Sequence, residues 1–212
     1  MSIPRPIETL TIAVTGASGA PYAEHFLRAV LALGIHAQLV ISPAGQRVIR
    51  EELDNKTWQA LLQHPRLRQY PHADIGASMA SGSRVADAMV VIPASMGTVA
   101  RIRAGLASNL IERAADVILK EGRLLILVPR ETPFNVIHLE NMLGLARAGA
   151  VILSANPAYY HRPKTLEDLF SYITGRILDR LGVANTVAPR WKSAAQNTHK
   201  IPKPVRRKRI RA

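Results

Sequence analysis

The sequence predicts a single-domain α/β protein in which parallel strands alternate with helices. Three observations predict this class. Apolar runs rich in β-branched residues are followed by segments with apolar residues at helical spacing, the first run ends in a glycine, and 212 residues suit one ordinary domain. The expected architecture is a three-layer, Rossmann-like (flavodoxin-like) fold with a mainly parallel sheet, whose ligands bind beyond the carboxyl ends of the strands.

The first strand is expected at 9–16, where TLTIAVTG ends in a glycine, and a helix follows at 22–33. The alternation continues with strands at 35–42, 88–92, 124–129 and 151–154, and with helices at 46–53, 106–120, 136–147 and 165–181. Residues 56–75 are polar and contain proline, so no element is predicted there. The last helix opens with Thr165 three residues before Asp168, the spacing of a capping box.

The net charge of +13 is concentrated at the carboxyl end of the chain. Nine of the 28 basic residues and none of the 15 acidic residues lie in 190–212, so the rest of the chain is nearly balanced. We expect one domain over 1–191 and a disordered basic tail over 192–212, because the tail is proline-punctuated and too polar to pack. A solvated solubility tail is favoured over a tail that binds nucleic acid or anionic lipid.

Composition also excludes several kinds of site. The chain has no cysteine, which rules out disulfides, thiolate metal sites and a cysteine nucleophile, and which is compatible with a reducing compartment. A cytoplasmic location is therefore expected. We expect neither a signal peptide nor a membrane span, because MSIPRPIETL lacks an apolar core and no apolar run reaches the length of a span. The seven histidines lack the spacing of a metal site, so no metal is expected.

Three expected strands end in loops with polar groups or glycines. Residues 15–20 (TGASGA) permit a sharp turn, and the N-terminus of the next helix would attract an anion such as a phosphate. The spacing matches neither the dinucleotide motif nor the Walker A loop, and a turn needed only for packing is the alternative. Residues 93–98 (PASMGT) add hydroxyls at the same sheet edge.

The third loop contributes Arg130 and Glu131, and an arginine is suited to bidentate contact with phosphate. A surface ion pair between the two residues is the alternative. Three such loops, with no acidic residue after the second strand to hold a ribose, favour a mononucleotide over NAD. FMN is the natural candidate.

These loops belong to a larger set of motifs that resembles the UbiX-type flavin prenyltransferases, in the UbiX/PAD family of flavoproteins. The motifs are TGASGAPY, ASGS, PASMGT, NLIERAADVILKE, VPRETPF, HLENML and PAYYHRPKTLEDL, in order between Thr11 and Trp191. The resemblance covers most of the chain, and NLIERAAD, PRETPF and YYHRP are specific as a set. One departure is Ala94, where many relatives have a cysteine. The resemblance implies an FMN site formed by Gly16, Ala17, Ser18, Ser42, Ser95, Met96, Gly97, Thr98 and Arg130.

The resemblance also implies a second ligand, dimethylallyl phosphate. It would be bound by Tyr160 and Arg176, with Arg113, Lys120, Arg130 and Glu131 contributed nearby in the assembled oligomer. Positive groups stabilise a departing phosphate while an electron-rich ring shelters the allyl cation. The dimethylallyl group would join N5 and then C6 of reduced FMN to give prenylated FMN.

Catalytic roles are implied for Ser18, Glu52 and Glu131, with Glu52 assisting proton removal during ring closure. The ordinary alternatives remain open: Glu52 as an exposed carboxylate, and Tyr160 as a core aromatic. Arg113 and Lys120 lie two helical turns apart on one face, where each could instead pair with a nearby glutamate. Trp191 matches a segment that closes over the site in relatives.

The family forms large homo-oligomers, so a homododecamer is expected, and its product serves UbiD-type decarboxylases. Three rival functions remain. A flavin-dependent cysteine decarboxylase shares the fold and a similar hydroxyl loop, but PAYYHRP favours prenyl transfer. Nucleic-acid binding through the tail is disfavoured because the body lacks interleaved aromatic residues. A non-catalytic FMN carrier would bind the flavin without modifying it.

Overall fold

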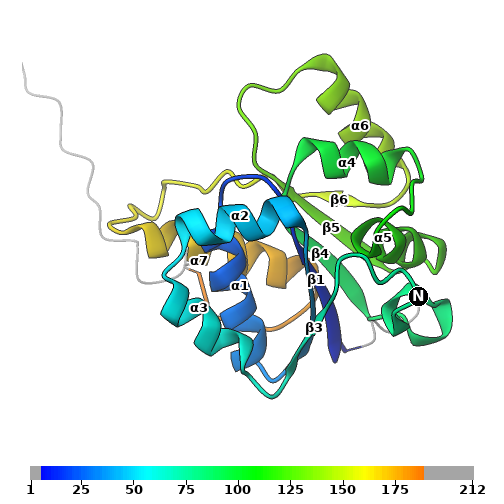
Figure 1. Cartoon of the computed structure of the whole chain (residues 1–212). Coiled ribbons are helices and arrows are strands. Elements are labelled where there is room, and N and C mark those ends of the chain that lie inside the picture. Colours follow the sequence, from blue (N-terminus) through cyan, green and yellow to red (C-terminus); the bar gives the residue numbers. More distant parts are fainter. Residues whose placement is uncertain (1–5, 189–212) are drawn as a thin grey trace, which may run out of the picture.

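A computed structural model describes residues 6–188. Its six-stranded, fully parallel sheet has the order β3-β2-β1-β4-β5-β6 (Figure 1). The strands are β1 (Thr9–Val14), β2 (His36–Ile41), β3 (Leu67–Tyr70), β4 (Ala88–Ala94), β5 (Leu124–Pro129) and β6 (Val151–Ile152). The direction of progression reverses between β1 and β4, which is the switch point where such sheets bind ligands. The predicted single-domain Rossmann-like architecture is confirmed.

Helices cover both faces of this sheet. They are α1 (Ala20–Ala32), α2 (Pro43–Glu52), α3 (Asn55–Leu62), α4 (Met96–Arg103), α5 (Leu110–Lys120), α6 (Val136–Arg147) and α7 (Leu166–Arg180), with short 3-10 turns at Ser78–Ala80 and Gly82–Arg84. Alternate residues of a strand pack in the cores on the two sides of the sheet, because successive side chains of a strand point to opposite faces. Ile12 packs in the core with α1 and α7, whereas Ala13 packs in the core with α4 and α5.

The structure adds elements where the sequence predicted none. The stretch 56–75 contains most of α3 and all of β3, whose sequence LRQY has two exposed residues because it is an edge strand. The loop predicted at 93–98 is the end of β4 and the first turn of α4. The helix expected at 106–120 begins only at Leu110, after its cap Asn109, and the helix expected from residue 46 begins at Pro43.

Close approach of α2 to the end of β1 depends on two glycines. A Cβ at Gly16 would lie 2.5 Å from Cβ of Ala44, and one at Gly45 would lie 2.6 Å from the carbonyl oxygen of Val14. Contacts this short do not occur between real atoms, so glycine is required at both positions. The two glycines bring the first turn of α2 against the carboxyl edge of the sheet.

The predictions for Trp191 and for the basic tail at 192–212 lie outside the described residues. Within 6–188, the structure contains no helix with the length and apolar character needed to cross a bilayer.

Candidate active site at the carboxyl edge of the sheet

The loops after β1 and β4 are joined by the side chain of Thr15. Its hydroxyl donates to the carbonyl oxygen of Pro93 at 2.7 Å and accepts from the N–H of Ser95 at 2.8 Å. Thr15 is 1% exposed, so both bonds are shielded from water and hold the loops in a fixed relation. Sequence reasoning placed both loops at the ligand edge but missed Thr15, because its role depends on the pairing of β1 with β4.

The loop after β5 reaches the same place through Arg130. Its Nε donates to the carbonyl oxygen of Ser18 at 2.8 Å, while Glu131 accepts from the backbone N–H of Thr132 at 3.0 Å. No ion pair joins Arg130 to Glu131 in the described part of the chain, which removes the surface-pair alternative. All three loops predicted from the sequence therefore meet at one edge.

The N-terminus of α1 already holds an anion. Glu52, the last residue of α2, accepts hydrogen bonds from the backbone N–H groups of Gly19 and Ala20, each at 2.8 Å. Gly19 has φ 121°, a conformation that favours glycine. The carboxylate thus stands where the sequence suggested a phosphate, and Glu52 is a half-buried, hydrogen-bonded group rather than a free exposed carboxylate.

Of the four predicted FMN-binding residues at 95–98, only two offer a polar side chain. Ser95 caps α4 by accepting from the N–H of Thr98 at 3.3 Å, and the two hydroxyl oxygens lie 3.0 Å apart. Met96 is 6% exposed and packs in the core. Gly97 is exposed, and a Cβ there would meet no atom within 4 Å. Polar contact from Met96 and Gly97 would come from their backbone N–H groups.

Ser42 and Thr98 line one cavity of about 550 Å³, a size typical of cofactor sites. Ser42 also caps α2 by accepting from the N–H of Gly45 at 3.0 Å. The cavity wall adds polar groups that sequence reasoning missed, namely His72, Arg101, Ser108, Asn109 and Glu112. They come from the connection after β3, from α4 and from the start of α5. A signal was available in the NLIERAAD motif, whose first residue caps α5.

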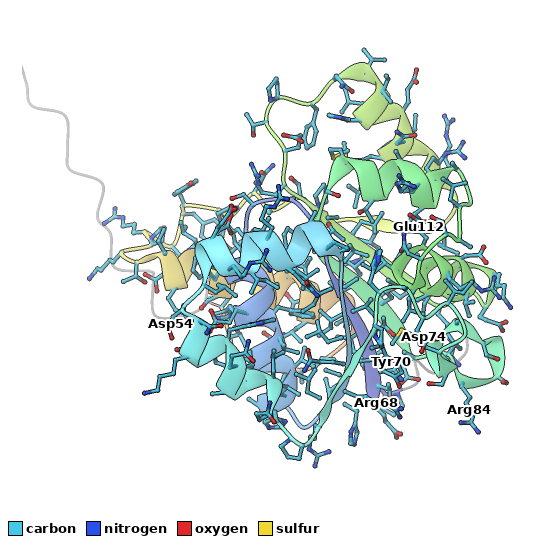
Figure 2. The ribbon with its side chains drawn as sticks, viewed as in Figure 1. Asp54, Arg68, Tyr70, Asp74, Arg84 and Glu112 are labelled. Atoms are coloured by element: carbon cyan, nitrogen blue, oxygen red, sulfur yellow. The ribbon has the colours of Figure 1, made fainter. Side chains whose placement is uncertain are left out.

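Glu112 is a buried carboxylate in this wall, 1% exposed (Figure 2). It accepts from the N–H and the hydroxyl of Ser108 at 2.9 and 2.6 Å, and Arg101 lies 3.8 Å away. Burial alone would raise the pKa of Glu112, but the bonds from Ser108 and Asn109 outweigh it and lower that pKa. Burial lowers the pKa of His72, against the opposing effect of Glu112. The wall therefore keeps Glu112 ionised and favours neutral His72.

The predicted donor residues Tyr160 and Arg176 also come together. The pKa of Tyr160 is raised mainly by burial, and further by the charge of Tyr172 and a hydrogen bond with it. The charge of Arg176 opposes this effect. Tyr172 and Arg176 line a cavity of about 280 Å³ beside the end of β6. The N–H of Ala155 donates to Pro129 at 3.1 Å, so this cavity adjoins the loop that carries Arg130. Tyr172 is a second residue that sequence reasoning missed.

Lys120 does not join this group within one chain, and the guanidinium of Arg113 is held by an ion pair. Arg113 pairs with Asp116 at 2.8 Å, and Lys120 pairs with Glu121 at 2.6 Å. Lys120 precedes β5 and Arg130 follows it, and a strand of that length spans about 20 Å. Lys120 would therefore have to reach the site from another subunit.

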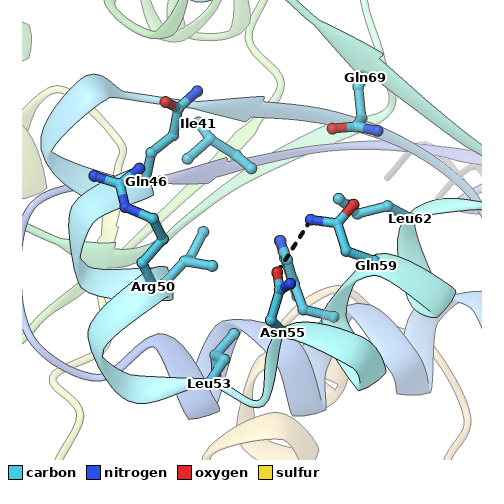
Figure 3. A pocket seen from close by; sticks show the side chains of 10 residues that line it. Ile41, Gln46, Arg50, Leu53, Asn55, Gln59, Leu62 and Gln69 are labelled. Carbon is cyan, nitrogen blue, oxygen red and sulfur yellow. Dashed lines mark hydrogen bonds between the residues drawn. The ribbon is translucent and has the colours of Figure 1, made fainter.

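A separate cavity of about 580 Å³ lies between α2, α3 and the sheet edge (Figure 3). Its lining combines apolar side chains, Trp58 among them, with Arg50 and several carboxamides. None of the predicted site residues lines this cavity. We therefore do not assign it as the candidate active site, although it is as large as the cavity beside Ser42 and Thr98. Within 6–188, no group of three or more histidine, aspartate or glutamate side chains could hold a metal ion.

The strand order and the polar loops at the switch point define a nucleotide-binding α/β protein of the flavoprotein class. The family model described as Flavoprotein matches residues 4–178. Two relatives described as flavin prenyltransferase UbiX are 44% identical (Pseudomonas aeruginosa; 87% of this chain, 94% of the relative) and 43% identical (Alkalihalophilus pseudofirmus; 86% and 95%). The chain belongs to the UbiX family of flavin prenyltransferases.

Two solved structures agree with this assignment. AnUbiX (PadA1), crystallised with FMN and dimethylallyl pyrophosphate, has a TM-score of 0.82 at 39% identity, over 89% of this chain and 99% of its own. A dodecameric FMN-dependent UbiX-like decarboxylase from Escherichia coli has a TM-score of 0.81 at 41% identity, over 87% and 100%.

Proposed function

We propose that the protein is a flavin prenyltransferase that transfers a dimethylallyl group from dimethylallyl phosphate to reduced FMN, giving prenylated FMN. The observation that carries this proposal is the meeting of three polar loops at the carboxyl edge, held by Thr15 and Arg130, in a chain 44% identical to a flavin prenyltransferase. AnUbiX binds FMN together with a dimethylallyl donor, which supports the same pair of ligands here.

The residues present fit FMN. The cavity beside Ser42 and Thr98 offers hydroxyl groups and the guanidinium of Arg101 to a phosphate. Arg130 uses Nε on Ser18 and keeps its other guanidinium nitrogens without a partner among residues 6–188. The proposed FMN-binding set is Gly16, Ala17, Ser18, Ser42, Ser95, Met96, Gly97, Thr98 and Arg130. Reduced FMN, when bound, supplies the electron-rich N5 and C6 that accept the dimethylallyl carbons.

Tyr160 and Arg176 bind the donor phosphate in this proposal, and Arg113 and Lys120 of a neighbouring subunit add positive charge. As the carbon–oxygen bond of the donor breaks, the bonding electrons leave with phosphate, and these donors stabilise the added charge. A monophosphate leaving group needs no metal clamp, so no metal is assigned.

Ser18, Glu52 and Glu131 are proposed as the groups that handle protons at the acceptor. Ring closure at C6 releases one proton, which requires a nearby base. Glu52 is held on two N–H groups at the loop that carries Ser18, and that position supports the assignment of a base there. Glu131 follows directly on the flavin-binding Arg130.

The assembly proposed is a homo-oligomer, a dodecamer as in the Escherichia coli relative, because Lys120 and Arg130 lie at opposite ends of β5 in one chain. The product is delivered to a UbiD-type decarboxylase. The domain is assigned to 1–191 and the basic tail to 192–212. The location is assigned to the cytoplasm, because a chain without cysteine is compatible with a reducing compartment.

The test is anaerobic incubation of the purified protein with reduced FMN and dimethylallyl phosphate, without added metal, and mass spectrometry of the released flavin. The expected result is a mass gain of one C5 unit. Unmodified FMN together with release of carbon dioxide from an offered acid would favour a decarboxylase, the description given to the Escherichia coli relative. Unmodified FMN without decarboxylation would favour a flavin carrier.

A further inference from the structure

His161, in the segment before α7, has an unusual environment for its ring nitrogens. Among buried side-chain nitrogen and oxygen atoms of residues 6–188, both ring nitrogens of His161 lack a hydrogen-bond partner. Native proteins leave few such atoms unpaired, because a buried polar atom without a partner has lost its hydrogen bonds to water and gained none. Two buried imidazole nitrogens without a partner therefore indicate that a bound ligand supplies the missing hydrogen bond.

The ring lies inside an aromatic cluster. It stacks on Tyr172 with a centroid separation of 5.7 Å and an interplanar angle of 7°, and it meets Tyr160 edge to face at 5.6 Å and 79°. Tyr160 in turn meets Tyr172 edge to face at 6.1 Å. Apolar ring contacts hold His161 in place on two sides, and they offer its nitrogens no acceptor.

The cluster borders the proposed donor site. Tyr172 and Arg176 lie one turn apart on α7 and line the same cavity, while the hydroxyl of Tyr160 is bonded to Tyr172. Tyr160 is 40% exposed, so it is the outer ring of the cluster.

The turn that carries His161 has strained backbone. Arg162 has φ 53°, the positive-φ conformation that non-glycine residues rarely adopt, and its N–H donates to the carbonyl oxygen of Tyr159 at 2.9 Å. Such strain is commonly stored beside ligands. It agrees with the unpaired imidazole in marking this turn as part of a binding site.

We propose that His161 is a further ligand of the donor phosphate, whose ring N–H donates a hydrogen bond to a phosphate oxygen beside Tyr160 and Arg176. This inference rests on the proposed function, because it takes dimethylallyl phosphate as the ligand. The step is an exchange of hydrogen bonds and involves no covalent change. The stack on Tyr172, which lies one helical turn before Arg176 on α7, holds the imidazole in place.

Two substitutions separate hydrogen bonding from stacking. His161→Phe keeps an aromatic ring on Tyr172 and removes the nitrogens, whereas His161→Asn keeps an N–H donor and removes the aromatic ring. Tyr159→Phe, on the exposed neighbour, is the matched control. The full chain loaded with oxidised FMN, which does not consume the donor, is titrated with dimethylallyl phosphate in a calorimeter, and the FMN affinity is measured alongside.

We expect His161→Phe to weaken donor binding by about tenfold or more, the usual effect of losing a hydrogen bond to a charged group. His161→Asn should weaken it less, and all variants should keep the FMN affinity of the original protein. The opposite order, with His161→Phe normal and His161→Asn impaired, would show that the ring serves only in packing and would overturn the inference.

A crystal structure of the unsubstituted protein with oxidised FMN and dimethylallyl phosphate covers the case in which the variants misfold. A ring nitrogen of His161 within hydrogen-bond distance of a phosphate oxygen supports the inference, and a water or a protein group in that place overturns it. Donor turnover by the original protein is measured first. Absence of turnover counts against the proposed function, whereas turnover with unchanged binding in His161→Phe counts against His161 alone.

Discussion

The carboxylate of Glu52 accepts a hydrogen bond from the backbone N–H of Gly19 at 2.8 Å, and a second from the next residue. The end of α2 thereby caps the start of α1. Because this bond pair joins two helices at the proposed flavin site, Glu52 has a structural role in addition to the proton-transfer role proposed for it.

Glu52→Ala should lower the free energy of unfolding by about 1–2 kcal/mol, the usual cost of losing a helix cap. Glu52→Gln should lose less stability, because an amide oxygen still accepts, but it should lose most of the transfer rate if the carboxylate acts as a base. Chemical denaturation and single-turnover transfer measure the two effects. Glu51→Ala, at the exposed neighbour, should change neither. Full transfer by Glu52→Gln would exclude proton removal by Glu52.

Thr15→Val should lower the affinity for FMN. The substitution removes the hydroxyl between Pro93 and Ser95 and leaves a shielded N–H without an acceptor, at a cost of about 1–3 kcal/mol. Thr11→Val is the matched control, since Thr11 is equally buried on β1 but bonds to Gln38 away from the loops. Equilibrium titration with FMN should show a lower affinity in Thr15→Val than in Thr11→Val. Equal affinities would mean that the loops after β1 and β4 keep their relative position without the Thr15 hydroxyl.

Arg101→Ala should weaken FMN binding by about tenfold to a hundredfold, because hydrogen bonds to charged groups contribute about 1.5–3 kcal/mol. Arg101 lines the cavity with Ser42 and Thr98. Arg103→Ala is the control, because Arg103 lies on the same helix but packs across Gly144. Fluorescence titration of FMN measures both, and an unchanged dissociation constant in Arg101→Ala would place the phosphate elsewhere.

The stability of the protein should fall as the pH drops below about 6.5, the ordinary histidine value. Burial lowers the pKa of His25, against the opposing effect of Glu167, and the ring bonds to Thr174 and Ser171 on α7. The unfolded chain therefore binds more protons between the two pKa values, so folding is favoured above this window and weakened within it.

His25→Gln should reduce that pH dependence, and His36→Gln, at the exposed first residue of β2, should retain it. Melting temperatures at pH 7.5 and pH 5.5 measure the difference. A melting temperature of the original protein that does not change between these values would contradict the role of His25 at the joint between α1 and α7.

Subunit exchange tests the shared site. Arg130→Ala and Lys120→Ala should each be nearly inactive, because each removes a positive charge from every site. In mixed oligomers, some sites combine an intact Arg130 from one subunit with an intact Lys120 from another, so part of the activity should return. If mixed oligomers of confirmed composition recover no activity, Arg130 and Lys120 of the same chain must act in the same site.

Much of the fold followed from the sequence because buried parallel strands are apolar runs and their helices carry the 3.6-residue period. β3 did not follow, since an edge strand with exposed residues has no apolar run. The meeting of the three polar segments at the carboxyl edge followed from strand ends alone, although 93–98 is the end of β4 and the start of α4 rather than a loop. The contacts of Thr15, Glu52 and Tyr172 could not be predicted, because each joins segments that are distant in the sequence.

The central claim is tested most directly by the mass of the flavin released after anaerobic single turnover with dimethylallyl phosphate, comparing the original protein with Arg176→Ala and Arg180→Ala. Both arginines line the cavity beside β6, but only Arg176 acts on Tyr160. We predict one added C5 unit with the original protein and with Arg180→Ala, and unmodified FMN with Arg176→Ala. Unmodified FMN from the original protein, with both ligands bound, would contradict the assignment as a flavin prenyltransferase.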